Sequence, residues 1–126
     1  MKAFSVSSVA IGFFLGFVVP YSLVFFIGPG IALATGQQKV TLGIWFTFLW
    51  LTVALLAPIG AGFLAAHLAK VQPLLHGAAV GLLGAIAGVA LSHPAQSAIY
   101  AALTCGTGGI VGGWLQRHVA RRSGAL

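Results

Sequence analysis

Residues 74–91 read LLHGAAVGLLGAIAGVAL and include no charged side chain. At about 1.5 Å per residue, a helix of this length crosses most of a hydrocarbon core roughly 30 Å thick. Glycines at a 4-3-4 spacing place a narrow stripe without side chains on one face of that helix: Gly77, Gly81, Gly84 and Gly88. Such stripes are typical of helices that approach each other closely in membranes. We therefore expect a transmembrane helix whose glycine stripe faces another helix.

The composition of the whole chain favours the same class of protein. Of 126 residues, 60% are hydrophobic and 5% are charged, and the mean hydropathy is +1.08, whereas soluble domains carry about 25% charged residues. A water-soluble fold with so few charges would expose apolar surface and aggregate. We predict an all-α, polytopic membrane protein whose single transmembrane domain covers residues 1–126.

Four apolar segments are long enough to cross a bilayer. We expect them to form a small four-helix bundle, with spans over residues 4–27, 42–66, 74–91 and 97–115. Gly28-Pro29-Gly30 should end the first span, and a basic cytoplasmic tail should follow the fourth over residues 116–126.

The basic residues are divided unequally between the two sides of this topology. Only Lys39 follows the first span directly, whereas the other cations share the opposite side: Lys2, Lys70, Arg117, Arg121 and Arg122. Because cytoplasmic loops carry an excess of Lys and Arg, both termini are predicted to lie in the cytoplasm.

The first span also has features of a secretory signal peptide. Lys2, the apolar run and then Ala32-Leu33-Ala34 resemble a charged start, an apolar region and a small-residue cleavage site after Ala34. However, the apolar run is longer than the usual ~7–15 residues, and Pro20 interrupts it. Both alternatives keep the same cytoplasmic C-terminus, so the charge distribution does not decide between them.

The chain contains no Asp or Glu, which excludes several classes of chemistry. Paired-carboxylate hydrolysis, carboxylate-bound Mg²⁺ or Ca²⁺ and a Ser-His-Asp triad all require acidic side chains. The histidines and the single cysteine, Cys105, do not have the spacing of a zinc or haem site. We expect no catalytic residues, no metal, no cofactor and no nucleic-acid partner.

Small residues of the fourth span are expected to meet the stripe of the third. They lie on one face of the predicted helix and include Gly106, Gly109 and Gly113. Packing of the third helix against the fourth within one chain is one interpretation of these two faces, and a seam between copies in a homo-oligomer is the other.

A second group of candidate residues is basic and belongs near the predicted cytoplasmic face. We expect these residues to contact anionic lipid headgroups: His67, Lys70, His76, Arg117, His118, Arg121 and Arg122. Either a defined headgroup site or nonspecific attraction of about 1 kcal/mol per basic residue would account for them.

The second span contains a proline followed by two glycines, namely Pro58, Gly60 and Gly62. Proline leaves the carbonyl four residues earlier without a donor, so a kink is expected. The kink serves either as a moving hinge or as a fixed packing feature.

Residues 58–84 read PIGAGFLAAHLAKVQPLLHGAAVGLLG. This hairpin, with its basic turn and its Leu-His-Gly start to the next helix, resembles a segment of small, uncharacterised four-span proteins of the bacterial inner membrane. The resemblance implies a multi-pass protein of the bacterial cytoplasmic membrane and assigns no functional residue.

Taken together, these patterns favour a noncatalytic integral membrane protein, not an enzyme. It would be an accessory or structural subunit of a larger membrane complex, or a small homo-oligomer packed through glycine-rich helix faces. The alternative hypothesis is a small transporter or channel for a neutral or anionic solute, with the Pro58 segment as its moving part.

Overall fold

The computed structural model describes residues 4–36, 41–91 and 95–124, and its long elements are all helices. In chain order they are α1 (Val6–Phe13), η1 (Phe14–Val18), α2 (Val19–Thr35), α3 (Thr41–Ala69), α4 (Pro73–Leu91) and α5 (Ala95–Arg122). Four stretches are long and apolar enough to cross a membrane: Val6–Ile27, Gly43–Ala69, Pro73–Leu91 and Ser97–Arg122. The predicted all-α fold, with four apolar helices packed as a bundle, is confirmed.

The first helix differs from the prediction in two ways. It runs through η1, a short π-helical segment, and it continues across Gly28-Pro29-Gly30 to Thr35. The candidate span itself ends at Ile27, immediately before Gly28-Pro29-Gly30, as predicted. The helix continues because glycine and proline lower helix stability without forcing the backbone out of the helix. The helix ends instead at Gly36, whose left-handed conformation (φ 60°) suits a residue without a Cβ.

The fourth span is also longer than predicted. α5 continues to Arg122, so residues 116–122 form its last two turns and are not a separate tail. Their helical structure fixes Arg117, Arg121 and Arg122 on a defined surface.

A tight turn joins α3 to α4. Lys70 and Gln72 both have positive φ angles (55° and 45°), and Pro73 then begins α4 at the position where its missing N–H costs nothing. The Gln72 carbonyl accepts hydrogen bonds from the backbone N–H groups of Leu75 (3.0 Å) and His76 (3.2 Å). These two hydrogen bonds fix the start of α4.

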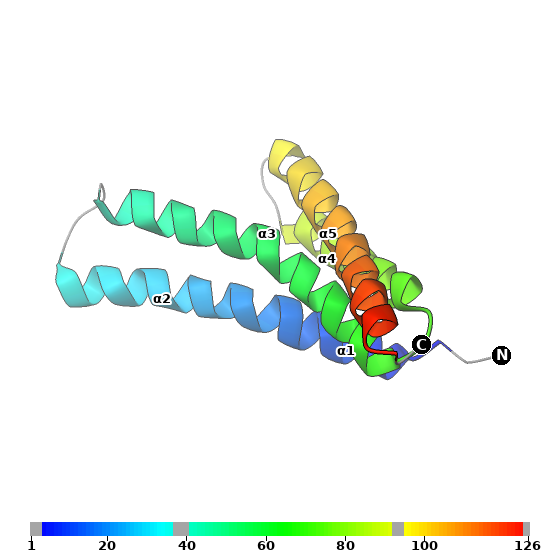
Figure 1. Cartoon of the computed structure of the whole chain (residues 1–126). Coiled ribbons are helices and arrows are strands. Elements are labelled where there is room, and N and C mark those ends of the chain that lie inside the picture. Colours follow the sequence, from blue (N-terminus) through cyan, green and yellow to red (C-terminus); the bar gives the residue numbers. More distant parts are fainter. Residues whose placement is uncertain (1–3, 37–40, 92–94, 125–126) are drawn as a thin grey trace.

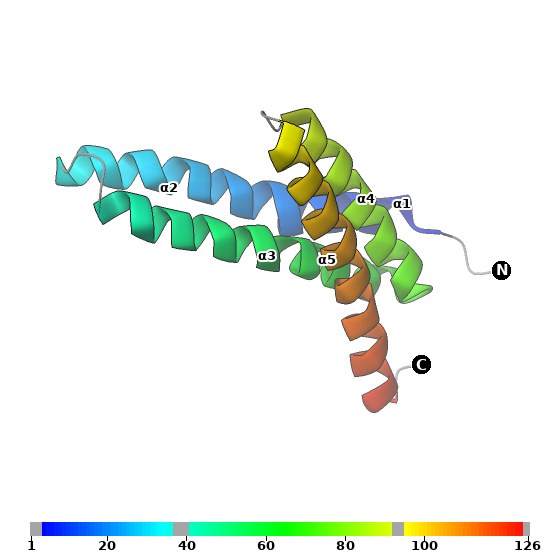
Figure 2. The ribbon, with the colours of Figure 1, turned by 90° about the horizontal axis from the view of Figure 1, so that it is seen from above.

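Two regions follow from the arrangement of the helices. α4 and α5 lie side by side and pack against the second half of α3, while α1 and η1 pack against that same half of α3 (Figure 1). α2 and the first half of α3 lie beside each other and extend away from α4 and α5, as both views show (Figures 1 and 2). We call α2 together with residues 41–55 of α3 the outer arm.

Buried positions hold mostly small side chains. The core cluster lies where α1, η1, α3, α4 and α5 meet and consists of Val9, Phe17, Ala61, Ala65, Val80 and Cys105. In the outer arm, by contrast, the largest side chains face outward: Phe25 is 67%, Phe26 73%, Trp45 72% and Phe48 66% exposed. An apolar exterior of this kind matches a hydrocarbon solvent.

Candidate functional site

The contact between α4 and α5 is made by backbone on both sides. A methyl group built on Gly81 would lie 2.8 Å from the carbonyl oxygen of Cys105, and one on Gly109 would lie 2.5 Å from the Cα of Gly81. A methyl group on Gly77 would meet the Cα of Gly113 at 2.9 Å. Distances this short exclude a side chain, so glycine at these positions is what allows the two helices to lie so close.

The remaining glycines of the two predicted stripes have different neighbours. A methyl group on Gly84 would lie 2.7 Å from Cε2 of the Phe17 ring. A methyl group on Gly88 would lie 2.8 Å from the Cβ of Ala101. Gly106 has open space where a Cβ would be. The α4 stripe therefore serves two neighbours, α5 and the first helix.

The same face of α5 also contacts α3. A methyl group on Gly62 would lie 2.8 Å from the Cα of Gly109, and one on Gly108 would lie 2.6 Å from the Cβ of Pro58. On Gly112 it would lie 2.6 Å from the backbone nitrogen of Phe63. We call the region where α3, α4 and α5 meet through these glycines the glycine junction: Gly62, Gly77, Gly81, Gly108, Gly109, Gly112 and Gly113.

Two of the three residues of the candidate hinge are packed against α5. Pro58 is among the largest wholly buried side chains and lies against α5, as does Gly62, whereas Gly60 faces open space. α3 bends partway along its length (Figure 1), and Pro58, which lies inside this helix, has no N–H to donate.

Sequence reasoning missed a second close contact, between the first helix and α3. A methyl group on Gly12 would lie 2.6 Å from the Cβ of Ala65, and one on Gly16 would lie 2.6 Å from the Cβ of Ala61. The available signal was the shared spacing of four residues, with glycines on one helix and alanines on the other.

His76 has a structural position that the prediction did not anticipate. Its exposed fraction is 0%, so it does not lie on the headgroup-facing surface where we expected it. Its Nε2 accepts a hydrogen bond from the backbone N–H of Ser5 at 3.0 Å, and its Nδ1 lies 3.1 Å from the carbonyl oxygen of Gln72. The acceptor role of Nε2 places the ring proton on Nδ1, which donates to Gln72. Phe4 stacks on the ring at 4.7 Å, so His76 ties the start of α1 to the α3–α4 turn.

His67 is exposed and interacts with α5. Its Nδ1 lies 3.2 Å from the amide nitrogen of Gln116, and its ring stacks on Phe63 at 6.3 Å. The side-chain oxygen of Gln116 is buried and, among the described residues, has no hydrogen-bond partner. This contact joins the last turn of α3 to the last turns of α5.

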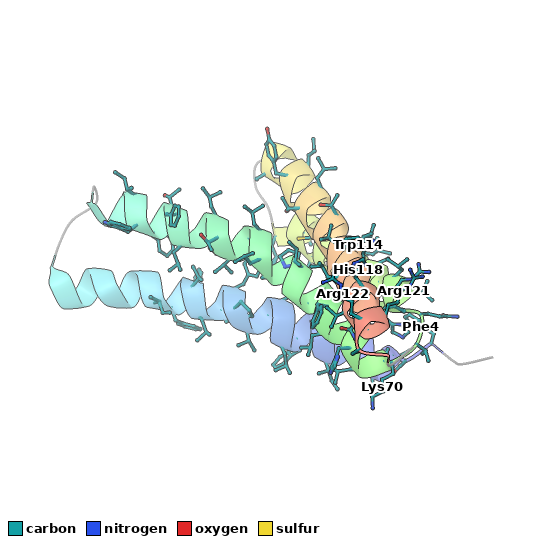
Figure 3. The ribbon with its side chains drawn as sticks, in the orientation of Figure 1. Phe4, Lys70, Trp114, His118, Arg121 and Arg122 are labelled. Carbon is teal, nitrogen blue, oxygen red and sulfur yellow. The ribbon has the colours of Figure 1, made fainter. Side chains whose placement is uncertain are left out.

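The remaining basic candidates lie on the α3–α4 turn and on the last two turns of α5. Figure 3 shows Lys70, His118, Arg121 and Arg122 on the same side of that view as Phe4, and Figure 2 shows that the last turns of α5 extend away from the start of α4. Arg117 is exposed and sits one turn before Arg121 on α5. Trp114, 52% exposed, stacks on His118 with ring centroids 5.3 Å apart. We call Lys70, Arg117, His118, Arg121 and Arg122 the basic end.

The fold and these sites define an integral, multi-pass membrane protein with four candidate spans. Within residues 4–36, 41–91 and 95–124, no group of three or more His, Cys, Asp or Glu side chains is placed to hold a metal ion. Comparison with protein families, with curated proteins and with solved structures gives no match to the chain.

Proposed function

We propose that the protein is a noncatalytic structural subunit of a membrane assembly, either a larger complex or a small homo-oligomer. We place it in the bacterial cytoplasmic membrane with both termini in the cytoplasm. The observation that carries this proposal is the outer arm, a helical hairpin that extends away from α4 and α5 and exposes large aromatic side chains.

The contacts of the glycines indicate which surface remains for a partner chain. Most of the glycines of the predicted stripes already face a helix of the same chain, with Gly106 as the exception. The glycine junction therefore supports a rigid scaffold, and the outer arm remains as the surface for a neighbouring chain. In lipid such contacts depend on van der Waals packing, and an aromatic pair adds about 0.5–1.5 kcal/mol beyond the area it buries.

The transporter hypothesis receives less support from the contacts around Pro58. A moving hinge needs room, yet Pro58 and Gly62 are packed against α5. The hydroxyls of Thr47 and Thr104 donate to carbonyls of their own helices, at 2.6 Å to Gly43 and 2.8 Å to Tyr100. We therefore propose the structural role.

The mass of the particle in a mild detergent tests the proposal. We expect a species heavier than one chain, and we expect its mass to fall when Phe26→Ala and Trp45→Ala are combined on the outer arm. The matched control combines Leu82→Ala and Ile86→Ala, which remove exposed side chains from α4. A monomer without partners, both in detergent and in lipid nanodiscs, would contradict the proposal.

A further inference from the structure

Charge at the basic end is not balanced within the chain. The sequence has six Lys and Arg but no Asp or Glu, and four of the six belong to the described residues at this end: Lys70, Arg117, Arg121 and Arg122. No acidic side chain of the chain exists to pair with them.

Helix dipoles do not neutralise these cations either. Pro73 at the start of α4 contacts Gly113, which lies nine residues, or about 13 Å, before the end of α5 at Arg122. The last turns of α5 therefore extend beyond the start of α4, as Figure 2 shows. The end of α5 itself carries only about half a negative elementary charge, against three arginines in its last two turns. The rest of the counter-charge must come from outside the chain.

The depth of the cations along α5 indicates the source of that counter-charge. Trp side chains favour the level of the lipid headgroups, and Trp114 lies on the exposed face of α5. At about 1.5 Å per residue, Arg117 follows Trp114 by about 4.5 Å along the axis and Arg122 by about 12 Å. The headgroup layer occupies about 5–7 Å on each side of the hydrocarbon core. Arg117 thus lies within this layer, whereas Arg121 and Arg122 lie on its aqueous side, from where their long side chains reach back to the headgroups.

We propose that the basic end binds the phosphate groups of anionic membrane phospholipids. The three arginines of α5 contact the phosphates, Lys70 contributes from the α3–α4 turn, and the stacked Trp114 and His118 lie beside the headgroups. Binding selects anionic over zwitterionic lipid because only the former brings net negative charge. This proposal is independent of the assembly role of the outer arm.

A single-tryptophan protein provides the readout. Trp45→Phe and Trp50→Phe leave only Trp114, whose fluorescence is quenched by lipids brominated in their acyl chains. The full chain is reconstituted into phosphatidylcholine vesicles containing 20% brominated phosphatidylglycerol or, in the comparison, 20% brominated phosphatidylcholine. We expect stronger quenching by the phosphatidylglycerol, and weaker preference as NaCl is raised.

Replacement of the exposed arginines tests their role without disturbing packing. Arg121→Gln should reduce the preference about fivefold, at roughly 1 kcal/mol per cation, and Arg117→Gln with Arg121→Gln and Arg122→Gln up to about 100-fold. The matching replacements by Lys keep the charge and should retain most of the preference.

Four results would overturn the proposal. Equal quenching by the two lipids would do so, as would a preference that survives loss of all three arginines. Loss of the preference in millimolar inorganic phosphate, at an ionic strength matched with NaCl, would assign the site to a free anion. Its loss with polyglutamate under the same matching would assign the site to an acidic protein segment.

Discussion

The glycine junction and the outer arm are built from opposite kinds of residue in the same apolar chain. At the junction, backbone meets backbone, and a methyl group on Gly109 would lie 2.5 Å from the Cα of Gly81. In the arm, large side chains such as Phe26 and Trp45 are mostly exposed, although Tyr21 and Trp50 meet edge to face at 5.3 Å. In lipid, hydrophobicity does not distinguish a helix–helix contact from a lipid contact. Here side-chain size distinguishes the close contacts within the chain from the exposed surface of the outer arm.

The largest effect is expected from adding one methyl group at the junction. Gly109→Ala forces α4 and α5 apart, and overpacking of this kind costs about 1–3 kcal/mol. The matched control is Gly106→Ala, three residues earlier on α5, where a Cβ meets open space. It should be neutral or stabilise by up to about 1 kcal/mol, because alanine favours helix over glycine. Thermal unfolding in detergent measures both; equal effects of the two variants would contradict a close contact at Gly109.

The next largest effect is expected at His76, which joins the start of α1 to the α3–α4 turn. His76→Leu introduces an apolar side chain of similar size and leaves the N–H of Ser5 without its acceptor. An unsatisfied buried donor costs about 1–3 kcal/mol. His118→Leu, on the exposed face of α5, should change stability by less than about 0.5 kcal/mol. Hydrogen exchange at the start of α1 should rise in the first variant alone; unchanged exchange there would show that the Ser5 bond is unimportant.

The smallest effect on stability is expected in the outer arm. Trp45→Ala removes a side chain that is 72% exposed, so the unfolding free energy should change by less than about 0.5 kcal/mol. The same experiment that measures Gly109→Ala compares the two regions directly. A loss at Trp45 as large as that at Gly109 would show that the arm is part of the core.

The sequence allowed the helices to be predicted, but not all of their contacts. Long apolar runs locate spans because a bilayer requires them, and the glycine spacing of α4 indicated which face approaches a neighbour. The identity of each neighbour depends on tertiary structure. Gly84 meets Phe17 on the first helix, and Gly12 and Gly16 meet α3, although only the third and fourth spans had been expected to pack through glycine.

Polar residues and residues that end helices were harder to predict from the sequence. His76 belongs to the same basic sequence region as His67 and Lys70, yet it is buried because Ser5, distant in sequence, supplies its donor. Gly28-Pro29-Gly30 has the composition of a helix end, whereas the left-handed backbone conformation occurs at Gly36. Whether a backbone leaves a helix depends on φ, which composition does not specify.

Disulfide formation between α4 and α5 tests most directly the claim that the glycine stripe of α4 meets α5 of the same chain. In a Cys105→Ala background, Gly88→Cys is combined with Ala101→Cys, since a Cβ on Gly88 would lie 2.8 Å from that of Ala101. A slight shift brings this pair to the 3.5–4.5 Å Cβ separation of a disulfide. Mild oxidation in native membranes should link the pair within a single chain, while Gly88→Cys with Leu103→Cys should stay reduced. A disulfide-linked dimer from the first pair, or no disulfide at all, would contradict the account.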